Sequence, residues 1–264
     1  MSPMGLLLTF LVGLFIVFGS LLGLYSKNNK RVTDMSVSIA FGVVLGLIVL
    51  ELLPGSYEIL SNKLGAFRAV ISIIILVLLG IVLLKMLDMF VPCHSHEEHH
   101  EHEHLNDDCR NDHLHHIGIV SSVAIVIHNL IEGASLYLVA KGDIASGVLL
   151  CLGVGLHNIP LGLVISSTLI GSNFKKINTI LIIVGVTIST FIGGFIMALI
   201  GEISELTEGL LLGLALGMLV YIAIFELAHQ IYHMKNKTLA RMCILFGLAI
   251  LVSSVILGSF VGEI

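Results

Sequence analysis

The sequence predicts an all-α polytopic membrane protein with eight transmembrane helices arranged as one membrane domain. Hydrophobic residues make up 56% of the 264 residues, charged residues only 12%, and the mean hydropathy is +1.05. Soluble domains carry about 25% charged residues, so this composition excludes an ordinary soluble fold. The apolar residues also gather into runs of about 20 residues, the helix length that crosses a bilayer. The chain suits about eight such spans with short loops and is too short for a sizeable soluble domain as well.

Residues 1–91 are expected to form spans 1 to 3. Their apolar runs cover about residues 4–25, 35–53 and 66–90. The N-terminus lacks a basic stretch and a small-residue cleavage site, so we expect the first run to be a retained span rather than a signal peptide. Span 2 is expected to end in the Glu-Leu-Leu-Pro sequence of residues 51–54, and span 3 ends before Pro92, because proline interrupts helical hydrogen bonding.

Residues 92–116 are expected to form a His-rich loop without stable structure. Nine of the thirteen histidines lie there among acidic residues, with no periodic apolar face. The segment contains two H-E-x-x-H strings, which in a metalloprotease lie on a buried helix beside a third ligand. Here they follow from a composition rich in His and Glu, and a loose metal-capturing loop is the better interpretation. Its candidate ligands are His94, His96, His99, His100, His102 and His104, with Cys93 and Cys109 as flanking thiols.

Residues 117–264 are expected to form spans 4 to 8. The first four runs cover about residues 117–140, 145–170, 179–200 and 210–232, and the last follows Arg241 and ends near residue 261. A tight turn at residues 141–143 joins spans 4 and 5. Cys151 and Cys243 lie within apolar runs and are expected to be packing residues. Gly193 and Gly194 in span 6 suit close helix packing.

Lysine and arginine residues predict the orientation of the spans. The odd-numbered loops, with the end of span 3 included, hold ten of these residues and the even-numbered loops hold three. Short cytoplasmic loops carry the excess of positive charge. We therefore expect the odd-numbered loops and the His-rich segment to be cytoplasmic and both termini to be extracellular.

Two near-copies of one motif place polar groups near the middle of the membrane. Residues 128–133 are His-Asn-Leu-Ile-Glu-Gly, and residues 157–162 are His-Asn-Ile-Pro-Leu-Gly. Each motif begins about a dozen residues into an apolar run, which is near mid-bilayer depth at about 1.5 Å per residue. Ionisable groups at that depth are costly and usually handle a polar or charged solute. A single intramembrane histidine is also explained by hydrogen bonding between helices, but two matched motifs favour the functional interpretation.

The residue types and their spacing predict a metal site. His128 and Glu132 are four residues apart and therefore share one helix face. With His157 from the next span they supply two imidazole nitrogens and a carboxylate, a set that suits zinc but also iron, nickel or cobalt. The other polar residues are expected to be weaker ligands or orienting groups (Asn129, Asn158) and an extension of the polar face (Ser121, Ser135).

The two motifs resemble those of the ZIP (Zrt/Irt-like) metal transporters, in particular the branch with His-Asn-x-Pro-Glu-Gly on both the fourth and fifth spans. The resemblance covers essentially the whole chain. It implies a bundle of eight helices that binds a divalent metal, above all zinc, between spans 4 and 5 and moves it towards the cytoplasm. It further implies that spans 1, 4, 5 and 6 move as a unit against spans 2, 3, 7 and 8.

Three residues depart from the pattern of that branch. Ile131 stands where the first motif has proline, and Leu161 where the second has glutamate. Thr190 in span 6 aligns with a further family carboxylate. Because two carboxylates are replaced, we expect one bound ion rather than two.

Further polar residues lie towards the ends of spans 2 and 7. Glu51 near the outer end of span 2, and Glu226 and His229 near the inner end of span 7, are candidates to line the metal pathway. Glu51 and Glu226 also match the family's Glu/His-Leu-Leu-Pro and Asp/Glu-Glu-Leu patterns. The alternative for such end groups is a side chain that reaches the membrane surface, which is preferred for Glu58 and His233.

The predicted function is transport of a divalent metal, above all zinc, into the cytoplasm by a multi-pass protein of the plasma membrane. The ion is the cargo, and neither an enzymatic activity nor a cofactor is expected. The alternatives are an intramembrane metalloenzyme, for which no second mid-membrane carboxylate remains in spans 4 to 6, and a metal sensor or buffer. The expected partners are the metal ion and the lipid bilayer. No basic surface suggests nucleic acid, and a homodimer is left open.

Overall fold

The computed structural model describes residues 2–25, 30–90, 105–172, 175–201 and 203–259, and over these residues the regular structure is entirely helical. Eight helices in this part of the chain are long and apolar enough to cross a membrane, as predicted. The elements in chain order are α1 (Pro3–Tyr25), α2 (Lys30–Gly46), η1 (Leu47–Leu52), α3 (Leu53–Leu64), α4 (Ala66–Phe90), α5 (Leu105–Gly142), α6 (Ile144–Gly171), α7 (Lys176–Ile200), α8 (Glu205–Tyr221), η2 (Ile222–Leu227), α9 (Ala228–His233) and α10 (Lys237–Ser259).

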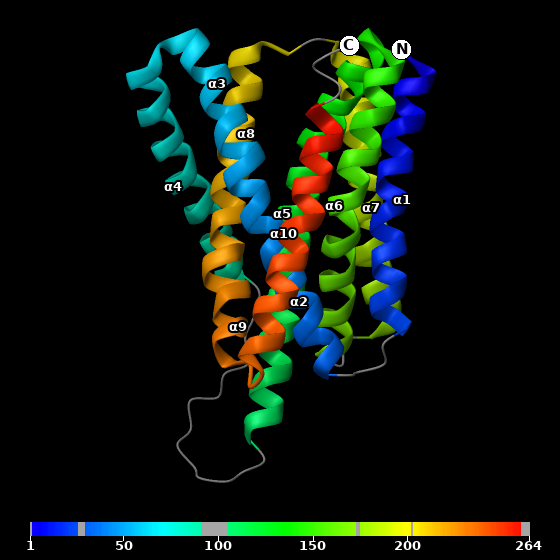
Figure 1. Ribbon diagram of the computed structural model, residues 1–264, viewed down its shortest axis with the longest axis vertical. Coiled ribbons are helices and arrows are strands. Elements are labelled where there is room, and N and C mark those ends of the chain that lie inside the picture. The colour runs from blue at the N-terminus through cyan, green and yellow to red at the C-terminus, as the bar shows by residue number, and fades with distance from the viewer. Residues whose placement is uncertain (1, 26–29, 91–104, 173–174, 202, 260–264) are drawn as a thin grey trace.

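The helices can be divided into two groups, with α2 and α10 of the second group lying next to α6 of the first (Figure 1). The α5–α6 group consists of α1, α5, α6 and α7, and the α2–α10 group consists of the remaining helices with the two π-helical turns. Within the first group α1 packs on α6 and α5 on α7, while in the second α2 packs on α10 and α4 on α8. Contacts of α6 with α2 and α10 join the groups. The start of α1 and the end of α10 lie at the same end of the bundle, as an even number of crossings requires.

Close backbone contacts hold each group together. A Cβ atom at Gly133 would lie 1.9 Å from the Thr190 carbonyl oxygen, and one at Gly193 would lie 2.0 Å from the Leu130 carbonyl oxygen. Glycine at both positions therefore lets α5 and α7 touch through their backbones, the arrangement by which small residues pack membrane helices. Three more helix pairs use reciprocal glycines: Gly19 with Gly162 (α1 and α6), Gly42 with Gly247 (α2 and α10) and Gly80 with Gly217 (α4 and α8). All four pairs lie within one group or the other.

Span 2 continues beyond the predicted end at Pro54. Residues Lys30–Leu64 form one long helical segment that is interrupted by the π-helical turn η1. In this turn the Leu53 N–H donates to the Ile48 carbonyl, five residues earlier. A proline has no N–H and its ring clashes with the carbonyl four residues before it, so the widened turn allows the helix to pass Pro54. The expected end of span 2 at residues 51–54 was therefore wrong.

The helix of span 4 also begins earlier than the predicted boundary at residue 117. α5 starts at Leu105, so residues 105–116 are helical, contrary to the expectation that they lack stable structure, although the apolar span itself begins at Gly118. The sequence from Leu105 to Ile117 contains neither glycine nor proline, and therefore nothing in it stops the helix. The six candidate loop histidines and Cys93 lie outside the described residues. The division into spans and a cytoplasmic loop stays a prediction.

Candidate metal centre

The turn between α5 and α6 brings the two motifs to the same depth. His128 lies 14 residues before Gly142 and His157 lies 14 residues after Asp143, which is roughly 21 Å of helix on each side. Asp143 caps α6, since its carboxylate accepts a hydrogen bond from the Ser146 backbone N–H at 2.7 Å. Hydrogen bonding from Ser146 holds the pKa of Asp143 below its usual value. The capped turn and the equal spacing together place the two histidines opposite each other.

Three predicted ligands meet in the space between α5 and α6. Ligand atoms of His128, Glu132 and His157 all lie within 4.8 Å of one another. The Glu132 Oε1 atom is 2.9 Å from His157 Nε2 and 3.6 Å from His128 Nε2. His128 and His157 are 5% and 1% exposed, and the Glu132 side chain is 8% exposed. Two nitrogens and a carboxylate oxygen at this separation fit a divalent metal with an open coordination position.

The His128 Nε2 atom supports this interpretation. It is buried and has no hydrogen-bond partner among the described residues. Buried polar atoms in proteins are almost always hydrogen-bonded, and an exception needs an explanation. The nearest acceptor, Glu132 Oε1, is 3.6 Å away, and a cation bound between the two groups would give this nitrogen a partner.

The two asparagines make different contacts. Asn158 Nδ2 donates to Glu132 Oε2 at 3.4 Å and therefore orients the carboxylate. Asn129 Nδ2 donates at 3.2 Å to the Val186 carbonyl of α7, so it ties two helices together. The amide oxygen of each is buried without a partner in the described part of the chain.

The positions that depart from the family pattern add no charge to the site. Leu161 is 1% exposed and apolar, and Thr190 is fully buried on α7 with a hydroxyl that has no partner among the described residues. Glu132 is the one carboxylate in the metal-ligand cluster found in the described residues.

The candidate pathway residues lie outside this cluster. Glu51 is half-buried in η1 and close enough to His157 for an electrostatic interaction. Glu226 is 4% exposed in η2, whereas His229 is exposed on α9 with its ring 4.7 Å from that of His233. Both carboxylates thus sit in π-helical turns, which are frequent at functional sites.

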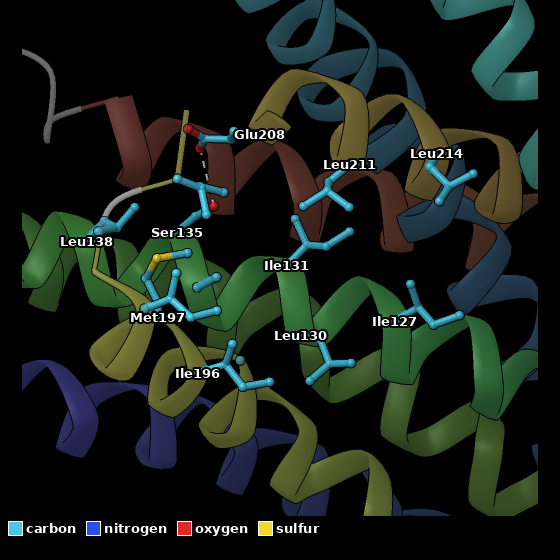
Figure 2. Close-up of a pocket in the computed structure, with 14 residues that line it drawn as sticks. Ile127, Leu130, Ile131, Ser135, Leu138, Ile196, Met197, Glu208, Leu211 and Leu214 are labelled. Atoms are coloured by element: carbon cyan, nitrogen blue, oxygen red, sulfur yellow. Dashed lines mark hydrogen bonds between the residues drawn. The ribbon is translucent and has the colours of Figure 1, made fainter. Parts of the chain in front are cut away.

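Ser135 does not extend the polar face towards the metal site, contrary to expectation. It lies beside an apolar cavity of about 320 Å³ between α5, α7 and α8, and its hydroxyl donates to Glu208 Oε1 at 3.5 Å (Figure 2). Ile131 lines the same cavity. Glu132, between Ile131 and Gly133, is turned towards α6 instead. Ser121 is 3% exposed, and its hydroxyl has no partner among the described residues.

Ser254 on α10 is a neighbour of the site that the sequence did not indicate. Its hydroxyl lies 3.4 Å from His157 Nδ1. The residue follows His157 by 97 positions and belongs to no motif. Its proximity results from the packing of α10 on α6, for which the sequence offers no signal. Cys151 and Cys243 are buried free thiols in helix interfaces, as predicted.

The fold and this cluster define a polytopic membrane protein with a buried candidate site for a metal ion. The family model described as ZIP Zinc transporter matches residues 92–254, more than half of the chain. The chain therefore belongs to the ZIP zinc transporter family, in agreement with the resemblance of its motifs.

Individual relatives agree with that membership. The chain is 27% identical over 229 residues to the zinc transporter ZupT of Chlorobaculum parvum, a match that covers 83% of this chain and 84% of the relative. It is 31% identical over 150 residues to the ZupT protein of Chlorobium chlorochromatii, and 33% identical over 147 residues to that of Chlorobium luteolum. In these two cases the match spans about half of each protein, 53% and 52% of this chain and 54% and 53% of the relative.

Proposed function

We propose that this protein transports a divalent metal ion, above all zinc, across the membrane into the cytoplasm. The observation that carries the proposal is the buried cluster of His128, Glu132 and His157, whose ligand atoms lie within 4.8 Å of one another. Relatives that match half or more of the chain are named zinc transporters. The ion is the cargo of this site.

The ligand set suits a site that must both bind and release its ion. Two neutral imidazoles and one carboxylate leave a bound dication with a net positive charge in a low-dielectric interior, which limits its affinity. Asn158 holds Glu132 in place, so the ligands need little reorganisation when the ion arrives. Conduction requires binding that is strong enough to admit an ion and weak enough to let it leave.

We further propose that the site holds one ion, in contrast to the branch with two acidic motifs. Two dications about 3.5–4 Å apart need bridging carboxylates to offset their repulsion. Leu161 and Thr190 cannot supply them, and the amide oxygens of Asn129 and Asn158 are neutral.

The proposed orientation of the chain in the membrane rests on the distribution of Lys and Arg, and the proposed direction of transport rests on the resemblance to the ZIP transporters. Ten of these residues in the odd-numbered loops against three in the even-numbered loops favour extracellular termini and a cytoplasmic His-rich segment. In that orientation Glu51 lies on the entry side of the site and Glu226 and His229 on the exit side. The loop histidines then capture the ion after its passage. A location in the plasma membrane and a homodimeric assembly belong to this proposal.

Reconstitution of the purified full chain in liposomes tests the proposal. A zinc-sensitive dye trapped inside should report saturable uptake that protein-free liposomes lack. A metal sensor or buffer would bind zinc without uptake, and that result would refute transport. A metalloenzyme would need a general base, but the one carboxylate of the described cluster is used as a ligand.

A further inference from the structure

The hydroxyl of Ser254 lies between two groups of α6. It donates a hydrogen bond to the Gly153 carbonyl oxygen at 2.5 Å and lies 3.4 Å from His157 Nδ1. Ser254 is 5% exposed and His157 is 1% exposed, so water does not compete for either contact. Gly153 is four residues before His157, one helical turn away on the same face.

Ser254 has one hydroxyl proton, and the group that receives it determines whether the Ser254 oxygen donates to the imidazole ring or accepts from it. A carbonyl oxygen only accepts, so the short contact with Gly153 uses the Ser254 proton. The Ser254 oxygen can then only accept from His157 Nδ1, which must carry a proton. On the other side of the ring Nε2 lies 2.9 Å from Glu132 Oε1, which only accepts, so without an ion Nε2 donates to it. A bound ion would take the place of that proton and use the Nε2 lone pair, while Nδ1 keeps its own proton towards Ser254.

We propose that Ser254 is a positioning residue that holds His157 in the tautomer and ring orientation needed to bind the transported ion. The inference rests on the proposed function, since it concerns the same site. Histidines that bind metals usually donate their other ring N–H to a neighbouring acceptor, which fixes the ring and strengthens the ligand. In this chain that acceptor is a serine from the last span.

The contact also crosses between the two helix groups. Ser254 lies on α10, which is joined to α2 by the close approach of Gly42 and Gly247. His157 lies on α6 in the other group. His157 is therefore held as a ligand only while α10 occupies this position beside α6, so the affinity of the site depends on the relative placement of the groups.

Zinc binding by matched variants of the full chain in nanodiscs tests the proposal. Thr and Val have nearly the same shape, so Ser254→Thr and Ser254→Val differ only in the hydroxyl. The readout is the rise of the thermal midpoint with zinc concentration, which reports affinity. Ser254→Val should need about 10-fold more zinc than the unmodified chain, the usual cost of losing an orienting partner. Ser254→Thr should stay close to the unmodified chain.

Two further variants make the result specific. Ser253→Ala removes an exposed hydroxyl that bonds within α10, and it should not change the zinc dependence. Any zinc stabilisation that remains in His157→Ala comes from other zinc sites. Adding Ser254→Val to His157→Ala should cause no further loss of zinc stabilisation. The proposal is overturned if Ser254→Val and Ser254→Thr show the same zinc dependence. It is also overturned if Ser254→Val weakens zinc binding as much in the His157→Ala variant as in the unmodified chain.

The outcome is separate from that of the transport assay. Binding that depends on His157 and Ser254 in a chain without uptake would refute the proposed function and leave this inference standing. If His157→Ala does not reduce zinc stabilisation, both the site assignment and the role of Ser254 are refuted.

Discussion

The two motifs of α5 and α6 have histidine, asparagine and glycine at the same positions but differ in charge. His128 and His157 begin the motifs and both face the cluster. The glycines that end them, Gly133 and Gly162, each allow a neighbouring backbone to approach, α7 in one case and α1 in the other. The repeated residues therefore have two separate roles, since the histidines are candidate metal ligands and the glycines let the helices pack closely.

The residues between them differ in what they contribute. The α5 motif carries Glu132, whereas the α6 motif has Leu161 at the same place. Asn158 contacts Glu132 across the site, but Asn129 turns to α7. One motif thus supplies the charge and the other supplies the group that orients it. The comparison shows that similar motifs in one chain need not make equivalent halves of a site.

Removing the charged residue of the α5 motif should have the largest effect. Glu132→Gln keeps the shape of the side chain but removes the negative charge, and His128→Ala removes a ligand. Either change should reduce zinc uptake by more than about 100-fold, beyond the cost of losing an orienting partner. Ser135→Ala is the matched control on α5, because Ser135 lies beside the cavity and not the site. Near-normal uptake by Glu132→Gln in proteoliposomes would contradict the assignment.

Giving the α6 motif its missing charge should create a second ion site. The double change Leu161→Glu with Thr190→Glu places carboxylates at the two positions where the motif resemblance implies them. Anomalous scattering from zinc-soaked crystals should show one strong peak between α5 and α6 in the unmodified chain and two in the variant. Two well-occupied peaks in the unmodified chain would show that the missing carboxylates do not limit occupancy.

Adding a methyl group to either motif glycine should destabilise the fold to a similar degree. A Cβ atom would lie 1.9 Å from a backbone oxygen at Gly133 and 2.2 Å at Gly162, so the helices must move apart. The expected loss for each Gly→Ala change is at least about 1–3 kcal/mol, measured as a lower thermal midpoint. Gly185→Ala on α7 is the control, since a Cβ there meets nothing within 4 Å. A loss at Gly185 equal to that at Gly133 would argue against packing as the cause.

The histidines outside the two motifs should matter less for transport. Deleting residues 94–104 removes the six candidate loop ligands without entering α5. A His- and Glu-rich segment of this composition binds metal weakly and adaptably, so we expect most of the uptake rate to remain. If this deletion abolished uptake as Glu132→Gln does, the loop would belong to the transport step.

The smallest effect is expected at the turn that aligns the motifs. Asp143→Ala removes the cap of α6 and should lower the thermal midpoint slightly at neutral pH. The pKa of Asp143 is lowered in the folded protein, so its contribution is present above the unfolded pKa of about 3.9 and is lost as the pH falls through the folded value. The difference between the two proteins should therefore shrink below about pH 4. A difference that stays constant to lower pH would exclude the ionised cap.

Local spacing made the spans and the cluster of candidate metal ligands predictable. Apolar runs of the length of a span fix the helices, and the four-residue separation of His128 and Glu132 fixes their common face. The equal distances of His128 and His157 from one turn then make them neighbours. No partner outside α5 and α6 is needed for these steps.

Features that depend on distant helices could not be predicted in this way. Ser254 reaches His157 because of how α10 packs on α6, and Ser135 turns to the cavity because α8 lies beside it. The π-helical turn before Pro54 is one of two ways in which a helix can respond to the N–H that proline lacks. The sequence is equally compatible with the other, a break in the helix. In each case the local pattern was compatible with more than one outcome.

The equal spacing on the two sides of the α5–α6 turn also bears on insertions and deletions. One residue added between His128 and Gly142 would turn His128 by about 100° around the helix axis and shift it by about 1.5 Å. The imidazole would leave the site although no residue of the motif had changed. The length of this segment is therefore under tighter constraint than the identity of most residues in it.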